Sequence, residues 1–184
     1  VDACEGHDDN ADADGDGTAD GCDETPDGDV TLNIEVTGEG SADVNYSSNV
    51  DVYGFQFDVS GVELTGASGD FDAISFSSAT GMVLGFDFTG ASLAAGEGTL
   101  VSLTFVPSVS SGTMSVADVV ATGAGGSALG VTGPEDAEVP GCANNDGDDL
   151  CNVADDCADD AENDADGDEI CGNVDECPYD ADND

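Results

Sequence analysis

The chain has no lysine or arginine to balance its 43 acidic residues, and its formal net charge is −43. Because acidic side chains then lack Lys or Arg partners, a folded form must take its cations from solution, and metal ions are the obvious source. The same absence excludes functions that need clustered cations, such as binding nucleic acid, phosphate or an anionic membrane. The placement of the acidic residues therefore constrains the fold more than any other feature.

Acidic residues and cysteines are concentrated towards the two ends of the sequence. Of the 43 acidic residues, 32 lie in residues 1–29 and 135–184, which also hold all seven cysteines. Turn-forming segments with Pro and Gly, residues 24–28 and 132–141, separate these parts from the centre. We predict an acidic N-terminal flank (1–29), an apolar domain (30–134) and an acidic C-terminal flank (135–184). The cysteine content indicates an oxidising compartment, so we expect an extracellular or cell-surface protein.

The central domain shows the period-two alternation of half-buried strands. Examples are the runs at residues 31–36, 55–59, 85–88 and 101–105, in which apolar and polar side chains alternate between Gly-rich and Ser-rich turns. No helical period is sustained, and no run approaches the ~18 apolar residues of a membrane span. Two sheets that bury their inner faces against each other are the usual solution for such strands. The sequence therefore predicts an all-β fold with a β-sandwich at its centre.

Several segments of this domain resemble a known family. They are Val52-Tyr53-Gly54-Phe55-Gln56-Phe57-Asp58-Val59, residues 64–69, residues 83–90, and Gly96-Glu97-Gly98-Thr99-Leu100. Over roughly residues 30–132, this pattern resembles the cohesin-type jelly-roll sandwich. The resemblance implies nine strands and a protein-binding or scaffolding role, with a generic β-sandwich spacer as the alternative.

The flanks contain a spacing typical of calcium loops. In residues 12–23, side-chain oxygens fall at loop positions 1, 3, 5, 9 and 12, Gly17 is at position 6, and position 7 offers a carbonyl. Ca²⁺ prefers six to eight hard oxygen ligands, and alternating carboxylates in a tight loop supply them. The predicted ligands are Asp12, Asp14, Asp16, the Thr18 carbonyl, Asp20 and Asp23. Position 12 is Asp rather than the longer Glu of the common version, which leaves bidentate binding open.

The C-terminal flank repeats this register twice. The ligands predicted in residues 144–155 are Asn144, Asp146, Asp148, the Leu150 carbonyl, Asn152 and Asp155. Those in residues 164–175 are Asp164, Asp166, Asp168, the Ile170 carbonyl and Asp175, with Gly172 at position 9 indicating a water. Leading half-loops add Asp8, Asn10, Asp160, Glu162, Asp180, Asp182 and Asp184, so that some carboxylates are expected to bridge two ions. We predict several bound Ca²⁺ ions and disordered flanks without them, because segments so polar cannot offset chain entropy by apolar burial.

The cysteines follow the same period of 20, since Cys151-x5-Cys157 recurs as Cys171-x5-Cys177. Regular Asp-x-Asp-x-Asp loops with spaced cysteines resemble the thrombospondin type 3 repeat, which implies organisation by calcium and disulfides. Our hypothesis pairs Cys151 with Cys157, Cys171 with Cys177 and Cys22 with Cys142, leaving Cys4 unpaired or intermolecular. Sequence alone leaves the connectivity open.

Both ends of the chain fall within a repeat, which allows two interpretations. The chain is either a window of a longer tandem protein or a subunit of a head-to-tail homopolymer. In both cases we expect a secreted, calcium-stabilised structural protein of a filament or stalk. The alternative is a cell-surface adhesin or cohesin-type module that recognises a protein or glycan. We expect no enzyme activity, because the carboxylate pairs lie in metal-loop register. Asn45 lies in the sequon Asn45-Tyr46-Ser47 and is a candidate N-glycosylation site.

Overall fold

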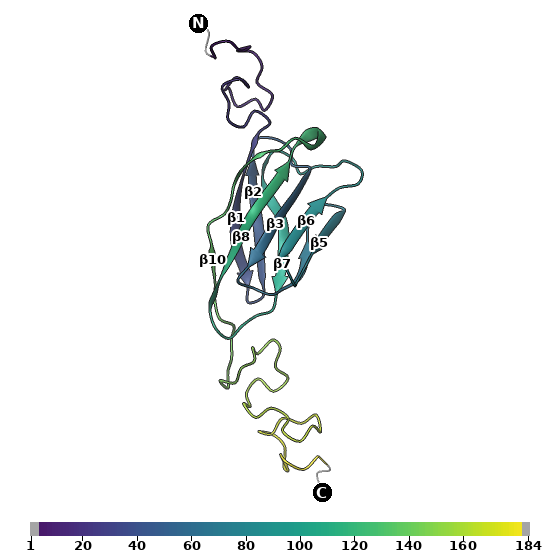
Figure 1. Cartoon of the computed structure of the whole chain (residues 1–184). Helices are drawn as coiled ribbons and strands as arrows, with labels where there is room; N and C mark the ends of the chain where they lie inside the picture. Colours follow the sequence, from purple (N-terminus) through teal and green to yellow (C-terminus); the bar gives the residue numbers. More distant parts are fainter. Residues whose placement is uncertain (1–3, 182–184) are drawn as a thin grey trace. The chain divides into compact units, whose positions relative to one another are not determined.

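The computed structural model describes residues 4–181 and places its strands in the central part of the chain (Figure 1). The first sheet has the order β4 (Leu64–Ser68), β7 (Gly96–Phe105), β2 (Ser41–Ser48), β1 (Asp29–Gly38) and β9 (Gly130–Thr132). The second has the order β10 (Ala137–Val139), β8 (Gly112–Thr122), β3 (Gly54–Ser60), β6 (Met82–Phe86) and β5 (Ala73–Phe76). A short 3-10 helix, η1 (Ala124–Gly126), precedes β9. The predicted all-β sandwich is confirmed.

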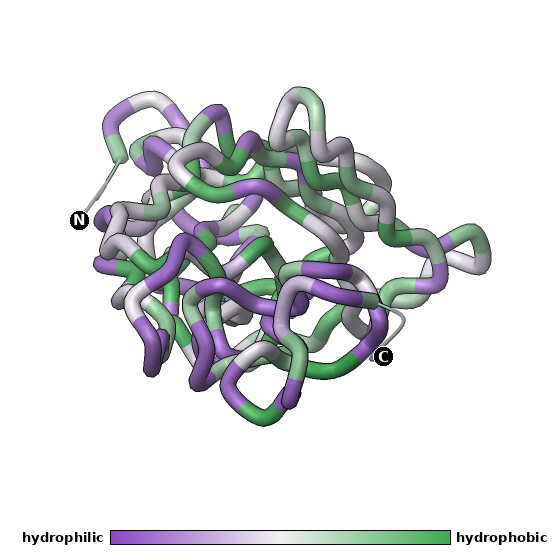
Figure 2. The backbone as a smooth tube through the Cα atoms, turned by 90° about the horizontal axis from the view of Figure 1, so that it is seen from below, coloured by the Kyte–Doolittle hydropathy of each residue, from purple (hydrophilic) through white to green (hydrophobic). Residues whose placement is uncertain are grey.

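Alternating side chains from both sheets form the core. Phe55, Phe57 and Val59 of β3 are buried while Gln56 between them is exposed, as the period-two pattern predicts. The rings of Phe55 and Phe57 stack with their centroids 5.4 Å apart. On β7, Leu100 and Val101 are both buried because the pairing with β2 shifts register between Val44 and Asn45. Figure 2 shows the alternation of polar and apolar residues along the backbone.

The run at residues 85–88 differs from its predicted pattern. β6 ends at Phe86, and Phe88 is 80% exposed rather than buried. Asp87 ends the strand because its Oδ1 atom accepts hydrogen bonds from the N–H and hydroxyl of Thr89, both at 2.6 Å. Gly85 instead faces inward, where a Cβ atom would lie 2.3 Å from the Phe55 ring. The sequence pattern predicts that Phe86 and Phe88 face the core. In the structure, the ring of Phe55 fills the core opposite Gly85 instead.

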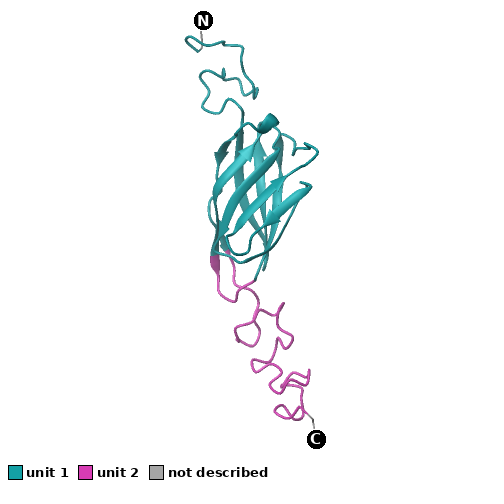
Figure 3. Cartoon of the chain, turned by 45° about the vertical axis from the view of Figure 1, so that its right-hand side comes forward, with its two compact units in different colours: residues 1–106, 113–138 teal, residues 107–112, 139–184 magenta. Residues whose placement is uncertain are grey.

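Contacts along the chain divide it into two compact units (Figure 3). The first contains residues 1–106 and 113–138, and the second contains residues 107–112 and 139–184. The N-terminal flank therefore shares a unit with the sandwich, while the division into three parts remains a prediction from composition. Within residues 4–181, no helix has the length and apolar character that crossing a membrane requires.

Candidate metal centres

Three loops of the flanks share one backbone design. We call residues 12–23 loop 1, residues 144–155 loop 2 and residues 164–175 loop 3, each numbered as positions 1 to 12. In every loop, the N–H of position 9 donates to the carbonyl of the residue before position 1. The bonds are Asp20 to Ala11 at 2.7 Å, Asn152 to Ala143 at 2.8 Å, and Gly172 to Asn163 at 3.0 Å. This bond closes each loop and brings its acidic side chains together.

A glycine at position 4 makes the tight turn possible. Gly15, Gly147 and Gly167 have φ angles of 76°, 81° and 82°, a region that favours glycine. Their N–H groups donate to the position-1 side chains Asp12, Asn144 and Asp164 at 2.8, 2.7 and 2.7 Å. We predicted the sharp turn at position 6, on Gly17, and missed the glycine at position 4. The shared signal was visible as the pattern Asp/Asn-x-Asp-Gly-Asp.

Position 5 of each loop also fixes the backbone that follows it. Its Oδ1 atom accepts the N–H of position 7, with distances of 2.6 Å for Asp16, 2.6 Å for Asp148 and 2.8 Å for Asp168. The position-5 side chain therefore makes the same hydrogen bond in all three loops. The residue that donates it differs, because position 7 is Thr18, Leu150 or Ile170. The position-7 carbonyls remain predicted ligands.

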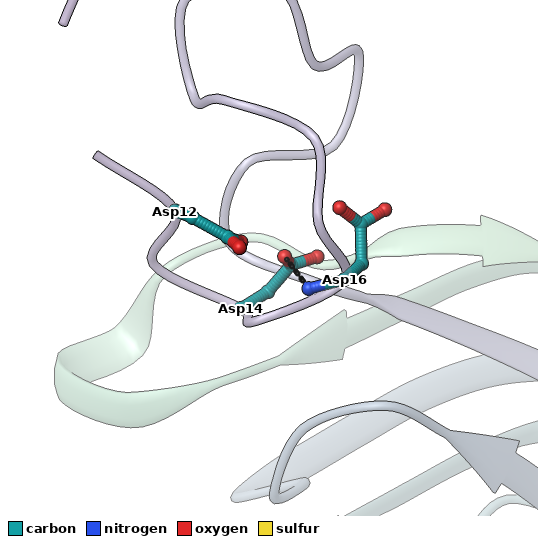
Figure 4. A group of neighbouring side chains, drawn as sticks. All are labelled: Asp12, Asp14 and Asp16. Carbon is teal, nitrogen blue, oxygen red and sulfur yellow. Dashed lines mark hydrogen bonds between the residues drawn. The ribbon is translucent and has the colours of Figure 1, made fainter. Parts of the chain in front are cut away.

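The structure brings carboxylates of each loop into a cluster in which ligand atoms lie within 4.8 Å of one another. The clusters contain Asp12, Asp14 and Asp16 in loop 1, Asp146, Asp148 and Asp155 in loop 2, and Asp164, Asp166 and Asp168 in loop 3. In Figure 4, the Asp14 carboxylate also accepts the N–H of Asp16. Asp20 and Asn152, the predicted position-9 ligands, instead accept the N–H groups of Ala13 at 2.7 Å and Asn145 at 2.9 Å.

Position 12 has the same unusual environment in all three loops. The Oδ1 atoms of Asp23, Asp155 and Asp175 accept the N–H two residues later, at 2.8, 2.8 and 2.7 Å. Their Oδ2 atoms are buried and have no hydrogen-bond partner in the described structure. The Oδ2 atom of Asp146 and both carboxylate oxygens of Asp166 share this state. A buried carboxylate oxygen without a partner is costly, and a bound cation removes the cost.

The residues present fit Ca²⁺. Each cluster offers hard oxygen donors and no thiolate or imidazole, the ligand type that Ca²⁺ requires. Neighbouring groups also shift the pKa values of two of these donors. In loop 3, the Glu169 N–H, at 2.8 Å, is the main cause of a lowered pKa at Asp164. Desolvation, followed by the charge of Asp168, raises the pKa of Asp166, as expected for carboxylates gathered without a cation.

The predicted half-loops are bound by protein groups. Asp8 accepts the backbone N–H and the side-chain amide of Asn10, at 3.0 and 3.1 Å. Asp160 accepts the N–H groups of Glu162 at 3.3 Å and Asn173 at 2.9 Å, and Glu162 accepts the Tyr179 hydroxyl at 2.6 Å. The Asp180 N–H donates to the Cys177 carbonyl at 2.8 Å. Asp182 and Asp184 lie outside the described residues. Ion bridging by these residues remains a prediction.

The predicted disulfide pairing is wrong in all three bonds. The structure pairs Cys4 with Cys22, Cys142 with Cys151 and Cys157 with Cys171, with Cα–Cα distances of 5.7, 5.7 and 5.5 Å. Each bond joins a cysteine that precedes a loop to one inside that loop, because loop closure folds the two segments against each other. Cys4 is therefore paired, and Cys177 is the free cysteine among the described residues. Three disulfides fit an oxidising compartment.

Two further asparagines lie on the sandwich. Asn45, the sequon residue, is half-buried on β2, where its amide donates to Glu35 at 3.4 Å and its Oδ1 atom accepts the Thr99 hydroxyl at 3.0 Å. Asn49 was not singled out in the sequence. Its amide donates to the Oδ2 atom of Asp14 at 2.9 Å, and its Oδ1 atom accepts the N–H of Asp29 at 2.7 Å. Asn49 thus ties loop 1 to the first strand of the sandwich.

Comparison with known proteins gives similarity at the level of structure alone. No protein-family model matches the sequence, and no curated protein matches it. A type I cohesin, solved in a cohesin–dockerin complex from Clostridium thermocellum, has 10% sequence identity and a TM-score of 0.47, covering 60% of this chain and 91% of that one.

Two further similar structures are also cohesins. A type I cohesin from Pseudobacteroides cellulosolvens has 15% identity and a TM-score of 0.45, covering 62% of this chain and 93% of that one. A non-cellulosomal cohesin from Archaeoglobus fulgidus has 13% identity and a TM-score of 0.45, covering 60% of this chain and 88% of that one. All three of these chains are cohesin modules. The thrombospondin type 3 resemblance of the flanks remains a prediction.

Proposed function

We propose that the chain is a secreted calcium-binding module in which each of the three loops binds one Ca²⁺ and thereby orders its flank. The observation that carries this proposal is the buried, unpartnered Oδ2 atom at position 12 of every loop, in Asp23, Asp155 and Asp175. The first oxygen of each carboxylate is already held by a backbone N–H, which fixes the second oxygen in place as a ligand. Such an arrangement is preorganised for a divalent cation.

Calcium would supply the folding free energy that the flanks lack. Their loops bury few apolar side chains, and cysteines are the main buried apolar residues there. The carboxylates repel one another, and no lysine or arginine exists to neutralise them. Because metal binding to such a site is linked to folding, the ordered flank and the bound ion form together. The sandwich has its own apolar core and does not depend on the ions for its existence.

Limited proteolysis tests this function. A protease that cuts after Glu and Asp suits the chain, since 32 of its 43 acidic residues lie in the flanks. With millimolar calcium we expect slow cleavage throughout. With EDTA we expect rapid loss of both flanks and survival of a resistant fragment near residues 29–139, with its β-sheet circular dichroism retained. Equal cleavage of the flanks with calcium and with EDTA would overturn the proposal.

A second candidate function is recognition of another protein by the sandwich. On the outer face of the second sheet, Leu84 and Val120 lie on either side of Gln56 in register, and Met82 precedes Leu84 along β6. Met82 is 40% exposed and Val120 is 52% exposed. Gly54, without a side chain, leaves a shallow cleft of about 300 Å³ between Phe86 and Thr122. An exposed apolar face on so acidic a chain favours a contact with protein.

The filament and the binding module differ in the partner that the chain contacts. In the filament, copies of the chain join head to tail, and in the binding module this face contacts a different protein. Sedimentation velocity of the wild type and of Leu84→Asp in calcium distinguishes the two functions. Association that persists in the variant, with fibres in electron micrographs, supports head-to-tail assembly that does not use this face. Monomers in both samples, with no fibres, support the binding module.

A further inference from the structure

Asn163 immediately precedes loop 3, at the place where alanine precedes loops 1 and 2. Its carbonyl accepts the N–H of Gly172 at 3.0 Å, the bond that closes loop 3. Ala11 and Ala143 provide the same carbonyl in loops 1 and 2, at 2.7 and 2.8 Å. A side chain beyond Cβ is therefore unnecessary for loop closure. The side-chain amide of Asn163 therefore takes no part in closing loop 3.

That amide contacts loop 2. The Nδ2 atom of Asn163 donates to the Oδ2 atom of Asp148 at 3.1 Å in a partly buried bond. The other oxygen of Asp148 accepts the Leu150 N–H at 2.6 Å, so the carboxylate is held from both sides. Asn163 has a φ angle of 57°, a left-handed conformation that asparagine tolerates better than most residues. One residue thus joins the closing carbonyl of loop 3 to the position-5 carboxylate of loop 2.

Loop 2 has the most buried position-12 carboxylate of the three candidate sites. Asp155 is 9% exposed, and its Oδ2 atom is buried without a partner among the described residues. Asp146 and Asp155 lie with Asp148 in a cluster whose ligand atoms are within 4.8 Å of one another. A cation bound there would fix the Asp148 carboxylate. The Asn163 amide, bonded to the same carboxylate, would then be fixed with it.

We propose that Asn163 couples the two metal sites of the C-terminal flank, so that filling loop 2 raises the calcium affinity of loop 3. This inference rests on the proposed calcium function. Ordering Asp148 reduces the motion of Asn163, and loop 3 then loses less conformational entropy when it closes on its own ion. The coupling is reciprocal, so calcium in loop 3 raises the affinity of loop 2 by the same factor. Asn163 is a positioning residue and need not touch either ion.

A double-mutant cycle followed by NMR tests the coupling in the full oxidised chain. The amides of Gly147 and Gly167 donate to the position-1 side chains of loops 2 and 3, so each reports calcium in its own loop. Asp155→Asn disables loop 2. In the background that keeps Asn163, we expect it to raise the calcium midpoint of the Gly167 signal about fivefold or more. In the Asn163→Gly background, which permits the left-handed φ angle, we expect less than about a twofold change.

The cycle isolates Asn163 from the other links between these loops, such as the Asn145 amide bonded to Asp159 at 2.9 Å. Asn163→Asp provides a second variant of similar size without the donor, and should give the same result as Asn163→Gly. Asn49→Ala removes a comparable amide–carboxylate bond at loop 1 and must leave the cycle unchanged. An equal effect of Asp155→Asn with and without Asn163 overturns the coupling but leaves calcium binding intact. If the NMR signals of the Gly147 and Gly167 amides do not change when calcium is added to the wild type, both proposals are overturned.

Discussion

Asn49 joins loop 1 to the sandwich, since its amide donates to the Asp14 carboxylate at 2.9 Å while its oxygen accepts the Asp29 N–H at 2.7 Å. Because the Asn49 side chain is hydrogen-bonded both to loop 1 and to β1, ordering the loop also restrains the start of β1. Calcium bound at Asp12, Asp14 and Asp16 is therefore expected to stabilise the sandwich as well as the flank.

Asn49→Ala should reduce this effect. We expect calcium to raise the melting temperature of the wild-type sandwich, and the variant to lose about 1 kcal/mol of that stabilisation, the scale of one partly exposed bond to a charged group. Differential scanning calorimetry with calcium and with EDTA measures it. Asn45→Ala is the control, because Asn45 lies on the adjoining strand β2 and its side-chain hydrogen bonds go to Glu35 and Thr99 rather than to loop 1. An equal calcium effect in wild type and Asn49→Ala would contradict the link.

The effect of Asp155→Asn on the C-terminal flank should be neutral or favourable without calcium and unfavourable with calcium. Without metal, the variant removes a buried negative charge whose Oδ2 atom has no hydrogen-bond partner, so we expect unchanged or higher stability of the C-terminal flank. With calcium, the same variant loses a charged ligand, and we expect binding of about one ion fewer per chain by isothermal titration calorimetry.

Asp156→Asn is a matched control for this pair of measurements, because Asp156 is the exposed neighbour of Asp155. It should leave the number of bound ions unchanged. Asp155→Asn that binds as many ions as the wild type, with equal affinity, would show that position 12 is no ligand.

The disulfide pattern makes a chemical prediction. Alkylation of the native, unreduced chain should add one label, and peptide mapping should find it on Cys177. Reduction should then release the Cys4–Cys22, Cys142–Cys151 and Cys157–Cys171 bridges. A label on Cys4, or a fragment that links Cys151 to Cys157, would contradict the structure.

Asp87 should give the sandwich an acid-sensitive contribution to stability. Hydrogen bonds from the Thr89 hydroxyl and then the Ala91 N–H lower the pKa of Asp87 to about 2. Because the folded pKa lies below the unfolded value near 3.8, the stabilisation is present above pH 4 and is lost as the pH falls towards 2. The bond to Asp87 raises the pKa of Asp72, which acts in the opposite direction.

Thermal unfolding in EDTA between pH 5 and pH 2 measures this contribution. Asp87→Ala should be less stable than the wild type at pH 5, and the difference should shrink towards pH 2. Glu97→Gln, at an exposed position of β7, should show no such trend. A difference between Asp87→Ala and wild type that stays constant with pH would contradict the assignment.

The candidate sites were more predictable from sequence than the bonds around them. Metal loops draw ligands from neighbouring residues, so the spacing of Asp12, Asp14 and Asp16 was sufficient to place them together. The disulfides required knowledge of how each loop closes on the segment before it, which spacing between cysteines does not contain. Asn49 and Asn163 were missed because each bonds to a carboxylate distant in sequence, 35 and 15 residues away.

The sandwich was predicted for a similar reason. Alternation on β3 and β7 follows from local period and was recovered, including buried Phe57 and Leu103. Phe86 and Phe88 show the same alternation in sequence, but β6 ends at Phe86 because Asp87 captures the following backbone. Apolar side chains compete for the limited space in the core. Here the Phe55 ring fills the space beside Gly85.

The arrangement of the disulfides determines how the C-terminal flank would carry a pulling force. Tension that enters at Cys142 passes through sulfur to Cys151, and tension at Cys157 passes to Cys171. Residues 143–150 and 158–170, which hold positions 1 to 7 of loops 2 and 3, then lie outside the load path. The bridges would let a stretched chain keep most of its ion ligands unstrained, with Asn152 and Asp155 as the predicted ligands of loop 2 that bear the load directly.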